Sequence, residues 1–478
     1  MTPRRALLLA APALLAAPGL RAQSLTIRQD DQVAPGWTRG VLIRWGDRVT
    51  FDAAPWDPAQ PSAEAAATQF GWDARIVALL PAGQQADGVP RALLAVAHPT
   101  VEAALAFPGG RDLPEVAGAM QGASLLNIER RGGAWSVVDG GFQNRRLTAA
   151  TLCRIGTEPV TGIIGVTGGC ATPWGSLLLA EGAAAAWRAR LPGFAQGSSG
   201  MVVELDPREP VSVPAKHPLL GRFGPADVAA ALSADGRAVV WMTDGRPGGF
   251  LYRFVSDAAA GPEALAAGRL AVARIEQGSL RWMPLPEGDP LAAARNAGGT
   301  GFDRPLGLAF DAPRGRLCLA VNQGGGGRVV EIRMAAGDNA AETGIAETLI
   351  EGVAVAAEAR RGRPPPAAPA WPWGPASLAF DAQGALLLAT DRGRRPGPLP
   401  EALYRVPLDG TERGRAAFLL AAPAGGAMGG AAAADGALFA AIAHPGATPG
   451  ATWQNPGTRW PNMRPEEPPR STVVTLAR

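Results

Sequence analysis

The sequence is poor in the side chains that most metal and redox sites use. Its 478 residues include only three histidines and three cysteines. The cysteines, Cys153, Cys170 and Cys318, form no Cys-x-x-Cys pair, which argues against a zinc site. An odd number of cysteines permits at most one disulfide and leaves one free thiol.

Charge is also scarce, and its balance argues against a nucleic-acid partner. Charged residues are 18% of the chain, below the usual ~25%. The 45 basic residues exceed the 42 acidic ones, and Arg4, Arg5 and Arg21 account for the formal charge of +3. Lys216 is the only lysine. Without the three N-terminal arginines the chain is neutral, so the basic footprint of a nucleic-acid-binding protein is missing.

The first 22 residues have the layout of an export signal. Residues 1–5 are basic, residues 6–19 are rich in alanine and leucine, and Ala22 offers a small residue for cleavage. The apolar part is too short to cross ~30 Å of hydrocarbon, and no later run of about 18 apolar residues lacks charges or breakers. We therefore expect a signal peptide over 1–22 of the Sec or twin-arginine type, one mature domain over 23–478, no membrane span, and a periplasmic or secreted location.

A pattern of short turns and apolar runs recurs along the chain. Glycine and proline are abundant, at 62 and 45 residues, which argues against a mainly helical protein. Apolar stretches at 307–310 and 377–380 each precede a turn and a second apolar run, which predicts hairpins. Turns followed by runs of strand length lie at 91–98, 174–181, 233–242, 311–321, 381–390 and 433–442.

Repeated hairpins are typical of radial β architectures, which leave no long exposed sheet edge. The pattern predicts an all-β propeller of about six blades with long irregular loops, in a single domain. A large β-sandwich is the structural alternative. Residues 352–372 are predicted to form a surface loop or linker, and the glycines within 421–434 argue against a long helix there.

Several motifs make the chain similar to a known family, over most of its mature length. The N-terminal and central motifs are Phe70-Gly-Trp-Asp-Ala-Arg75 and Gly165-Val-Thr-Gly-Gly-Cys-Ala-Thr-Pro-Trp-Gly-Ser176, and the C-terminal ones are His444-Pro-Gly446, Asn455-Pro-Gly457 and Pro469-Arg-Ser-Thr-Val-Val474. With these motifs the chain resembles the PhoX-type alkaline phosphatases, which are exported β-propellers. The resemblance implies hydrolysis of phosphomonoesters at a cluster of iron and calcium ions, held by carboxylates and a cysteine thiolate.

The sequence departs from the family pattern at positions that this resemblance assigns to metal ligands. Thr167 stands where the family has its cysteine, Arg75 replaces an aspartate, and Arg246 lies in the family's acidic run. Two unit charges about 4 Å apart interact by ~4 kcal/mol at an effective dielectric of about 20, and arginine cannot shed its proton to relieve repulsion from a metal. We therefore expect that metal-dependent phosphatase activity is lost or reduced, and we assign no catalytic residue.

Few candidates for a metal site survive these replacements. They are His98, Glu181 and Asp244, with Asp391 as a further possibility. The alternative for the carboxylates is turn capping or surface solvation, and for His98 a hydrogen bond at a strand end. No cofactor is predicted beyond the calcium and iron that the resemblance implies.

Two functional hypotheses stay open. In the first, the arginines Arg75 and Arg246 face the channel with Arg145 or Arg146 and bind a small anionic ligand, phosphorylated or carboxylated, without cleaving it, so that the protein is a pseudoenzyme. In the second, the protein is an active alkaline phosphatase with a reduced calcium and iron site. A serine hydrolase is disfavoured because no G-x-S-x-G motif is present. Of the other histidines, His217 is expected in a surface loop and His444 in a structural turn.

Overall fold

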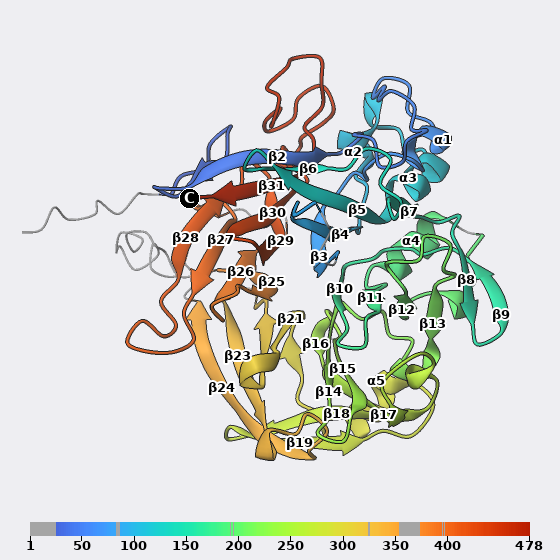
Figure 1. Ribbon diagram of the computed structural model, residues 1–478, viewed down its shortest axis with the longest axis vertical. Helices are drawn as coiled ribbons and strands as arrows, with labels where there is room; N and C mark the ends of the chain where they lie inside the picture. Colours follow the sequence, from blue (N-terminus) through green and yellow to red (C-terminus); the bar gives the residue numbers. More distant parts are fainter. Residues whose placement is uncertain are drawn as a thin grey trace, which may run out of the picture.

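The computed structural model describes residues 25–478 except 83–86, 192, 195, 324–325, 353–372, 394 and 396. This part of the chain consists mainly of antiparallel strands, which form sheets around a central axis (Figure 1). The predicted signal peptide, and all but the first residue of the loop predicted over 352–372, lie outside the described residues.

Six four-stranded units, here called blades 1 to 6, follow one another along the chain. In each blade neighbouring strands are antiparallel, and they follow one another in chain order from the centre of the ring outward. Blade 6 is the exception, because its outermost strand comes from the N-terminal part of the chain. Blades 1 to 3 are β3 (Arg75–Pro81), β4 (Arg91–His98), β5 (Gly122–Arg131) and β6 (Ala134–Val137); β10 (Gly168–Ala171), β11 (Leu177–Ala180), β12 (Val202–Leu205) and β13 (Ala215–His217); and β14 (Asp227–Leu232), β15 (Arg237–Thr243), β17 (Leu251–Ala259) and β18 (Gly268–Glu276). Blades 4 to 6 are β21 (Pro305–Asp311), β22 (Arg316–Val321), β23 (Gly327–Met334) and β24 (Thr343–Gly352); β25 (Pro375–Phe380), β26 (Leu386–Thr390), β27 (Ala402–Val406) and β28 (Ala417–Ala421); and β29 (Ala427–Ala434), β30 (Ala437–Ala443), β31 (Thr472–Ala477) and β2 (Thr38–Arg44).

The other elements extend or connect these blades. β19 (Ser279–Pro284) pairs with both β18 and β24, so blades 3 and 4 form one continuous sheet. The shorter strands are β1 (Gln32–Val33), β7 (Arg145–Leu147), β8 (Leu152–Ile155), β9 (Glu158–Thr161), β16 (Pro247–Gly249) and β20 (Phe302–Asp303). The α-helices lie in the connections and are α1 (Ala63–Ala66), α2 (Ala103–Ala106), α3 (Pro114–Met120), α4 (Ala184–Arg190) and α5 (Pro290–Asn296). None of these helices in the described ranges is long and apolar enough to cross a membrane.

The blades close into a ring. The innermost strands β3, β10, β14, β21, β25 and β29 each contact the innermost strands of both neighbouring blades, as Figure 1 shows around the centre. Blade 6 joins the two ends of the chain, because β2 pairs with β31 and places Val41 opposite Val474. The predicted all-β propeller of about six blades is confirmed, and a β-sandwich is excluded because its sheets would not meet in a ring.

Glycine permits the close approach of neighbouring inner strands. A Cβ atom on Gly429 of β29 would lie 1.9 Å from the carbonyl oxygen of Ala74, and one on Gly307 of β21 would lie 2.5 Å from that of Ala376. Neither backbone neighbour can move aside as a side chain can. The glycines within 421–434 therefore belong to a strand, β29, and the expectation that no long helix forms there is confirmed.

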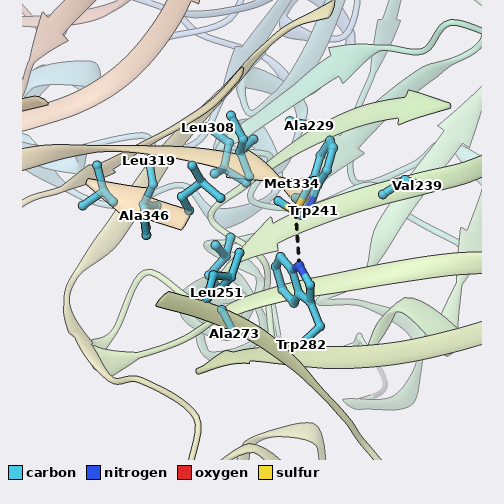
Figure 2. Close-up of a cluster of buried hydrophobic side chains, with 14 of the residues drawn as sticks. Ala229, Val239, Trp241, Leu251, Ala273, Trp282, Leu308, Leu319, Met334 and Ala346 are labelled. Atoms are coloured by element: carbon cyan, nitrogen blue, oxygen red, sulfur yellow. Dashed lines mark hydrogen bonds between the residues drawn. The ribbon is translucent and has the colours of Figure 1, made fainter. Parts of the chain in front are cut away.

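The hydrophobic core lies between neighbouring blades. Figure 2 shows the cluster between blades 3 and 4, where Trp241 and Trp282 pack with aliphatic side chains of both blades. The indole N–H of Trp282 points to the sulfur of Met334 at 3.4 Å. At the ends of the inner strands, by contrast, lie polar side chains such as Arg75 of β3 and Asp227 of β14.

Candidate functional site

Two adjoining hollows lie among the ends of the inner strands. The first, here called the channel hollow, has a volume of about 230 Å³, and its polar lining includes Arg75, Thr167, Asp227, Arg304 and Asp391. The second, here called the arginine hollow, has a volume of about 550 Å³ and is lined by Arg188, Arg222, Arg246, Asp244 and Asp289. The two hollows are adjacent, and Thr167, Ala226 and Leu306 line both.

Arg75, the first residue of β3, forms an ion pair in the channel hollow. Its Nη2 donates to Oδ2 of Asp391, which follows β26, at 2.5 Å. Burial raises the pKa of Asp391, but Arg75 and His444 outweigh this effect and hold the pKa below its ordinary value. The Nε of Arg75 is buried and has no hydrogen-bond partner in the described part of the chain. Arg75 therefore keeps one donor that the protein does not use.

A carboxylate–histidine pair lies next to this ion pair. The carboxylate of Asp73 is buried, and its Oδ1 is 3.4 Å from Nδ1 of His444, whose ring stacks on Trp72. Thr100 donates its hydroxyl to Oδ2 of Asp73 at 2.9 Å. Burial raises the pKa of Asp73, but His444, Arg75 and Thr100 outweigh it and lower the pKa to about 2. Asp73 is thus ionised at neutral pH, and the pKa of His444 is raised by it against the opposing effect of burial.

Asp227 at the start of β14 links three blades. Its Oδ1 accepts hydrogen bonds from the backbone N–H groups of Gly169 and Val228, and its Oδ2 accepts one from Leu308, all at 2.9 Å. Burial raises the pKa of Asp227 to about 7 although these three donors oppose the change. The charge in the channel hollow therefore changes near neutral pH.

Arg304 is the functional candidate that sequence reasoning missed. It lies directly before β21 with φ of 57°, and it lines the channel hollow. No described side chain forms a hydrogen bond or ion pair with its guanidinium. Its position in an Asp-Arg-Pro segment gives no indication of this, because only the ring of blades brings the segment to the same hollow as Arg75. The channel hollow thus contains one arginine without a carboxylate partner.

Glu181, one of the metal candidates, is engaged by the only lysine. Nζ of Lys216 is 2.8 Å from Oε1 of Glu181, and both side chains are completely buried. The same Nζ donates to the carbonyl oxygen of Ser198 at 2.7 Å. Oε1 also accepts from the N–H of Ile164, and Oε2 accepts from that of Gly200 at 2.9 Å. Burial raises the pKa of Glu181, and Lys216 opposes that rise.

Asp244, the second metal candidate, pairs with Arg246 two residues later. Nε and Nη2 of Arg246 donate to the two carboxylate oxygens at 2.7 and 2.8 Å. Asp244 is buried, whereas 51% of the Arg246 side chain is exposed at the arginine hollow. The hydrogen bonds that Arg246 donates to Asp244 raise the pKa of Arg246.

The histidines are held by internal hydrogen bonds. His98 ends β4, and its Nδ1 contacts the carbonyl oxygen of Asp73 while its Nε2 lies 2.7 Å from the hydroxyl of Ser124. Burial lowers the pKa of His98 well below its ordinary value. The expectation that His217 lies in a surface loop is wrong. His217 ends β13, is buried, and places Nε2 2.9 Å from a carboxylate oxygen of Glu204.

The structure does not bring the predicted arginines together. Arg75 lines the channel hollow and Arg246 the arginine hollow, whereas Arg145 and Arg146 line neither. Arg145 donates to the carbonyl oxygens of the loop at 206–212. Arg146 is buried under β5 and donates to the carbonyl oxygens of residues 119, 121 and 123, and burial lowers its pKa to about 9. These two side chains hold backbone segments in place.

The residues present do not fit a cluster of calcium and iron ions. Thr167, which the resemblance predicts at the position of the family's cysteine, donates its hydroxyl to the carbonyl oxygen of Ala226 at 2.8 Å. Within the described ranges, no group of three or more His, Cys, Asp or Glu side chains is placed to hold a metal ion. Three of the nearby carboxylates pair with an arginine or a lysine: Asp391 with Arg75, Asp244 with Arg246, and Glu181 with Lys216. Asp73 lies against His444, and Asp227 is held by backbone N–H groups.

The fold and the two hollows define a six-bladed propeller with a polar, arginine-lined cavity at the inner strand ends. The family described as alkaline phosphatase PhoX matches residues 21–446, and the chain belongs to this family. No curated protein matches the sequence. Among solved structures, Pseudomonas fluorescens PhoX in complex with vanadate, a transition state analogue, is similar with a TM-score of 0.83 and 23% identity, over 96% of this chain and 97% of that one.

Two further solved structures have lower similarity. The aldose sugar dehydrogenase of Streptomyces coelicolor, in its PQQ-bound form, has a TM-score of 0.35 and 12% identity, over 93% of this chain and 99% of that one. The gluconolactonase XC5397 of Xanthomonas campestris has a TM-score of 0.35 and 11% identity, over 95% and 96% of the two chains.

Proposed function

We propose that this protein is a PhoX-family propeller that binds a small anionic ligand in the channel hollow and has lost metal-dependent phosphomonoesterase activity or retains little of it. The observation that carries the proposal is that Asp391, Asp244 and Glu181 each pair with an arginine or a lysine, whereas Arg304 has no carboxylate partner among the described residues. A carboxylate that already has an internal cation offers little to a metal ion. An arginine without a carboxylate partner, by contrast, attracts an anion.

Arg304 and Arg75 are the residues that would bind the anion. Both arginines line the hollow, and Arg304 has no hydrogen-bond or ion-pair partner among the described residues. Guanidinium groups recognise oxyanions through paired charge-assisted hydrogen bonds, and they are more weakly hydrated than ammonium groups. The PhoX of Pseudomonas fluorescens binds vanadate, itself an oxyanion, which supports the same ligand chemistry here.

Titration calorimetry with sulfate, inorganic phosphate and propyl phosphate tests this proposal. We expect binding in the millimolar range or tighter, and we expect Arg304→Gln to weaken it about tenfold, because one charge-assisted hydrogen bond contributes about 1.5–3 kcal/mol. The control is Arg415→Gln, since Arg415 is exposed and pairs with Glu412 at the surface. No heat of binding at millimolar ligand would refute the proposal.

Family membership favours one other function, an active alkaline phosphatase with a reduced calcium and iron site. It is tested by metal analysis of the purified protein and by turnover of p-nitrophenyl phosphate with added Ca²⁺ and iron. Turnover that a chelator abolishes would establish this function in place of the first. Substoichiometric metal together with no turnover would eliminate it.

The proposed location is the periplasm or the exterior, on the strength of the N-terminal export pattern. N-terminal sequencing of the protein from fractionated cells tests this proposal. Recovery of an intact first 22 residues from the cytoplasmic fraction alone would contradict it.

A further inference from the structure

We infer that the arginine hollow is a second anion subsite, and that the ligand of this protein therefore carries two anionic groups on a short linker. The inference rests on the proposed function for the channel hollow and adds the class of ligand. Three arginines from separate elements converge on this hollow: Arg188 on α4, Arg222 after β13, and Arg246 after β15.

Two of these arginines have no carboxylate partner in the described part of the chain. Nη1 of Arg188 donates to the hydroxyl of Ser199 at 3.0 Å, and Nη1 of Arg222 donates to the carbonyl oxygen of Gly197 at 2.9 Å. A guanidinium has five N–H donors, so each of the two keeps donors that no described residue accepts. The neutral partners fix the two side chains without cancelling their charge.

The other charged groups of the hollow do not compensate for this excess. Asp244 accepts hydrogen bonds from Nε and Nη2 of Arg246. Oδ1 of Asp289 accepts one from the N–H of Leu291 at 3.0 Å. Three positive groups therefore face two negative ones. The local field favours an anion, and its strength falls with added salt.

The two hollows share part of their lining. Thr167, Ala226 and Leu306 line both hollows, and Gly182 lies beside them in the arginine hollow. A Cβ atom at Gly182 would lie 2.2 Å from Oγ1 of Thr167, so glycine is required there. In the inferred arrangement one ligand reaches both hollows, with one oxyanion at Arg304 and the other at Arg188 and Arg222.

A pair of matched probes tests the inference. Propyl phosphate and 1,3-propanediol bisphosphate have the same three-carbon chain and differ in the number of phosphates. We expect titration calorimetry at constant ionic strength to show at least tenfold tighter binding of the bisphosphate. A series of diol bisphosphates with longer chains then locates the best spacing, because a linked second contact acts at a high effective concentration only when the linker spans both sites.

The substitutions Arg188→Gln and Arg222→Gln are expected to bring the ratio of the two affinities close to one. Arg415→Gln is the matched control and should leave the ratio unchanged, since Arg415 is exposed and far along the chain in blade 5. If one of the two variants fails to fold, the other carries the same test, because each arginine lies on a different element.

The outcomes separate this inference from the proposed function. Equal affinities of the wild-type protein for the two probes would overturn the second subsite and leave the anion site at Arg304 standing. A bisphosphate preference that depends on Arg188 and Arg222 but not on Arg304 would support the second subsite and overturn the proposed channel site.

Discussion

The buried pair of Lys216 and Glu181 allows a strong test of the electrostatic account of this site. The change is Lys216→Met, which preserves most of the length of the side chain and removes its charge. Both side chains are fully buried, so the substitution leaves Glu181 as an uncompensated buried carboxylate. Removal of one partner from a buried ion pair costs about 3–5 kcal/mol.

The hydrogen bonds to Glu181 determine where the expected loss in the free energy of unfolding falls within that range. The N–H groups of Ile164, Gly200 and Met201 donate to its two oxygens and continue to do so in the variant. They stabilise the carboxylate, so we expect a loss near the lower end, about 3 kcal/mol. The double variant Lys216→Met, Glu181→Gln should regain more than half of this loss, because no buried charge is left.

Equilibrium unfolding in urea, followed by tryptophan fluorescence, measures these free energies. Arg415→Met is the control and should change the free energy of unfolding by less than about 0.5 kcal/mol, because Arg415 is exposed. The loss in Lys216→Met should shrink as the pH falls, since burial raises the pKa of Glu181 and protonation removes its charge. A loss below about 1 kcal/mol, or a double variant no more stable than the single one, would refute the reasoning.

Three further predictions concern other parts of the molecule. Folded Asp227 keeps its proton to about pH 7, whereas an unfolded aspartate loses it near 3.8, so the free energy of unfolding should fall as the pH rises between these values. In Asp227→Asn this dependence should be absent, and equal pH profiles from urea unfolding would contradict the assignment. Gly429→Ala should cost about 1–3 kcal/mol, because its Cβ would lie 1.9 Å from a carbonyl oxygen, whereas Gly193→Ala meets nothing within 4 Å and should be neutral in the same assay. All three cysteines are free thiols. A thiol reagent should therefore titrate three thiols in denaturant without reductant, and a count of one would reveal a disulfide.

Local sequence patterns predicted the fold because hairpins are local structures. The segments 233–242, 381–390 and 433–442 each contain the turn and the second strand of a hairpin. In each hairpin this second strand pairs with the strand directly before it in the sequence. Turn residues and apolar runs of strand length determine such pairs without reference to the rest of the chain. The glycines of β29 indicated that no long helix forms there. The sequence did not indicate that Gly429 lies against the backbone of Ala74 in another blade.

The composition of the site was decided by contacts between distant segments. Arg145 and Arg146 are neighbours in the sequence, yet the strand alternation and the packing of β5 direct them away from both hollows. Arg304 was not predicted as a site residue because the sequence around a loop arginine does not show whether a carboxylate pairs with it in the folded protein.

The sequence by itself determined the all-β repeat, and its motifs indicated the family. The tertiary structure alone decided which charges meet: Arg75 pairs with Asp391 across 316 residues, and Lys216 pairs with Glu181 between strands of blade 2. The physical reason is that a side chain's partner depends on the ring of blades, and ring closure is a property of the whole chain rather than of any one segment.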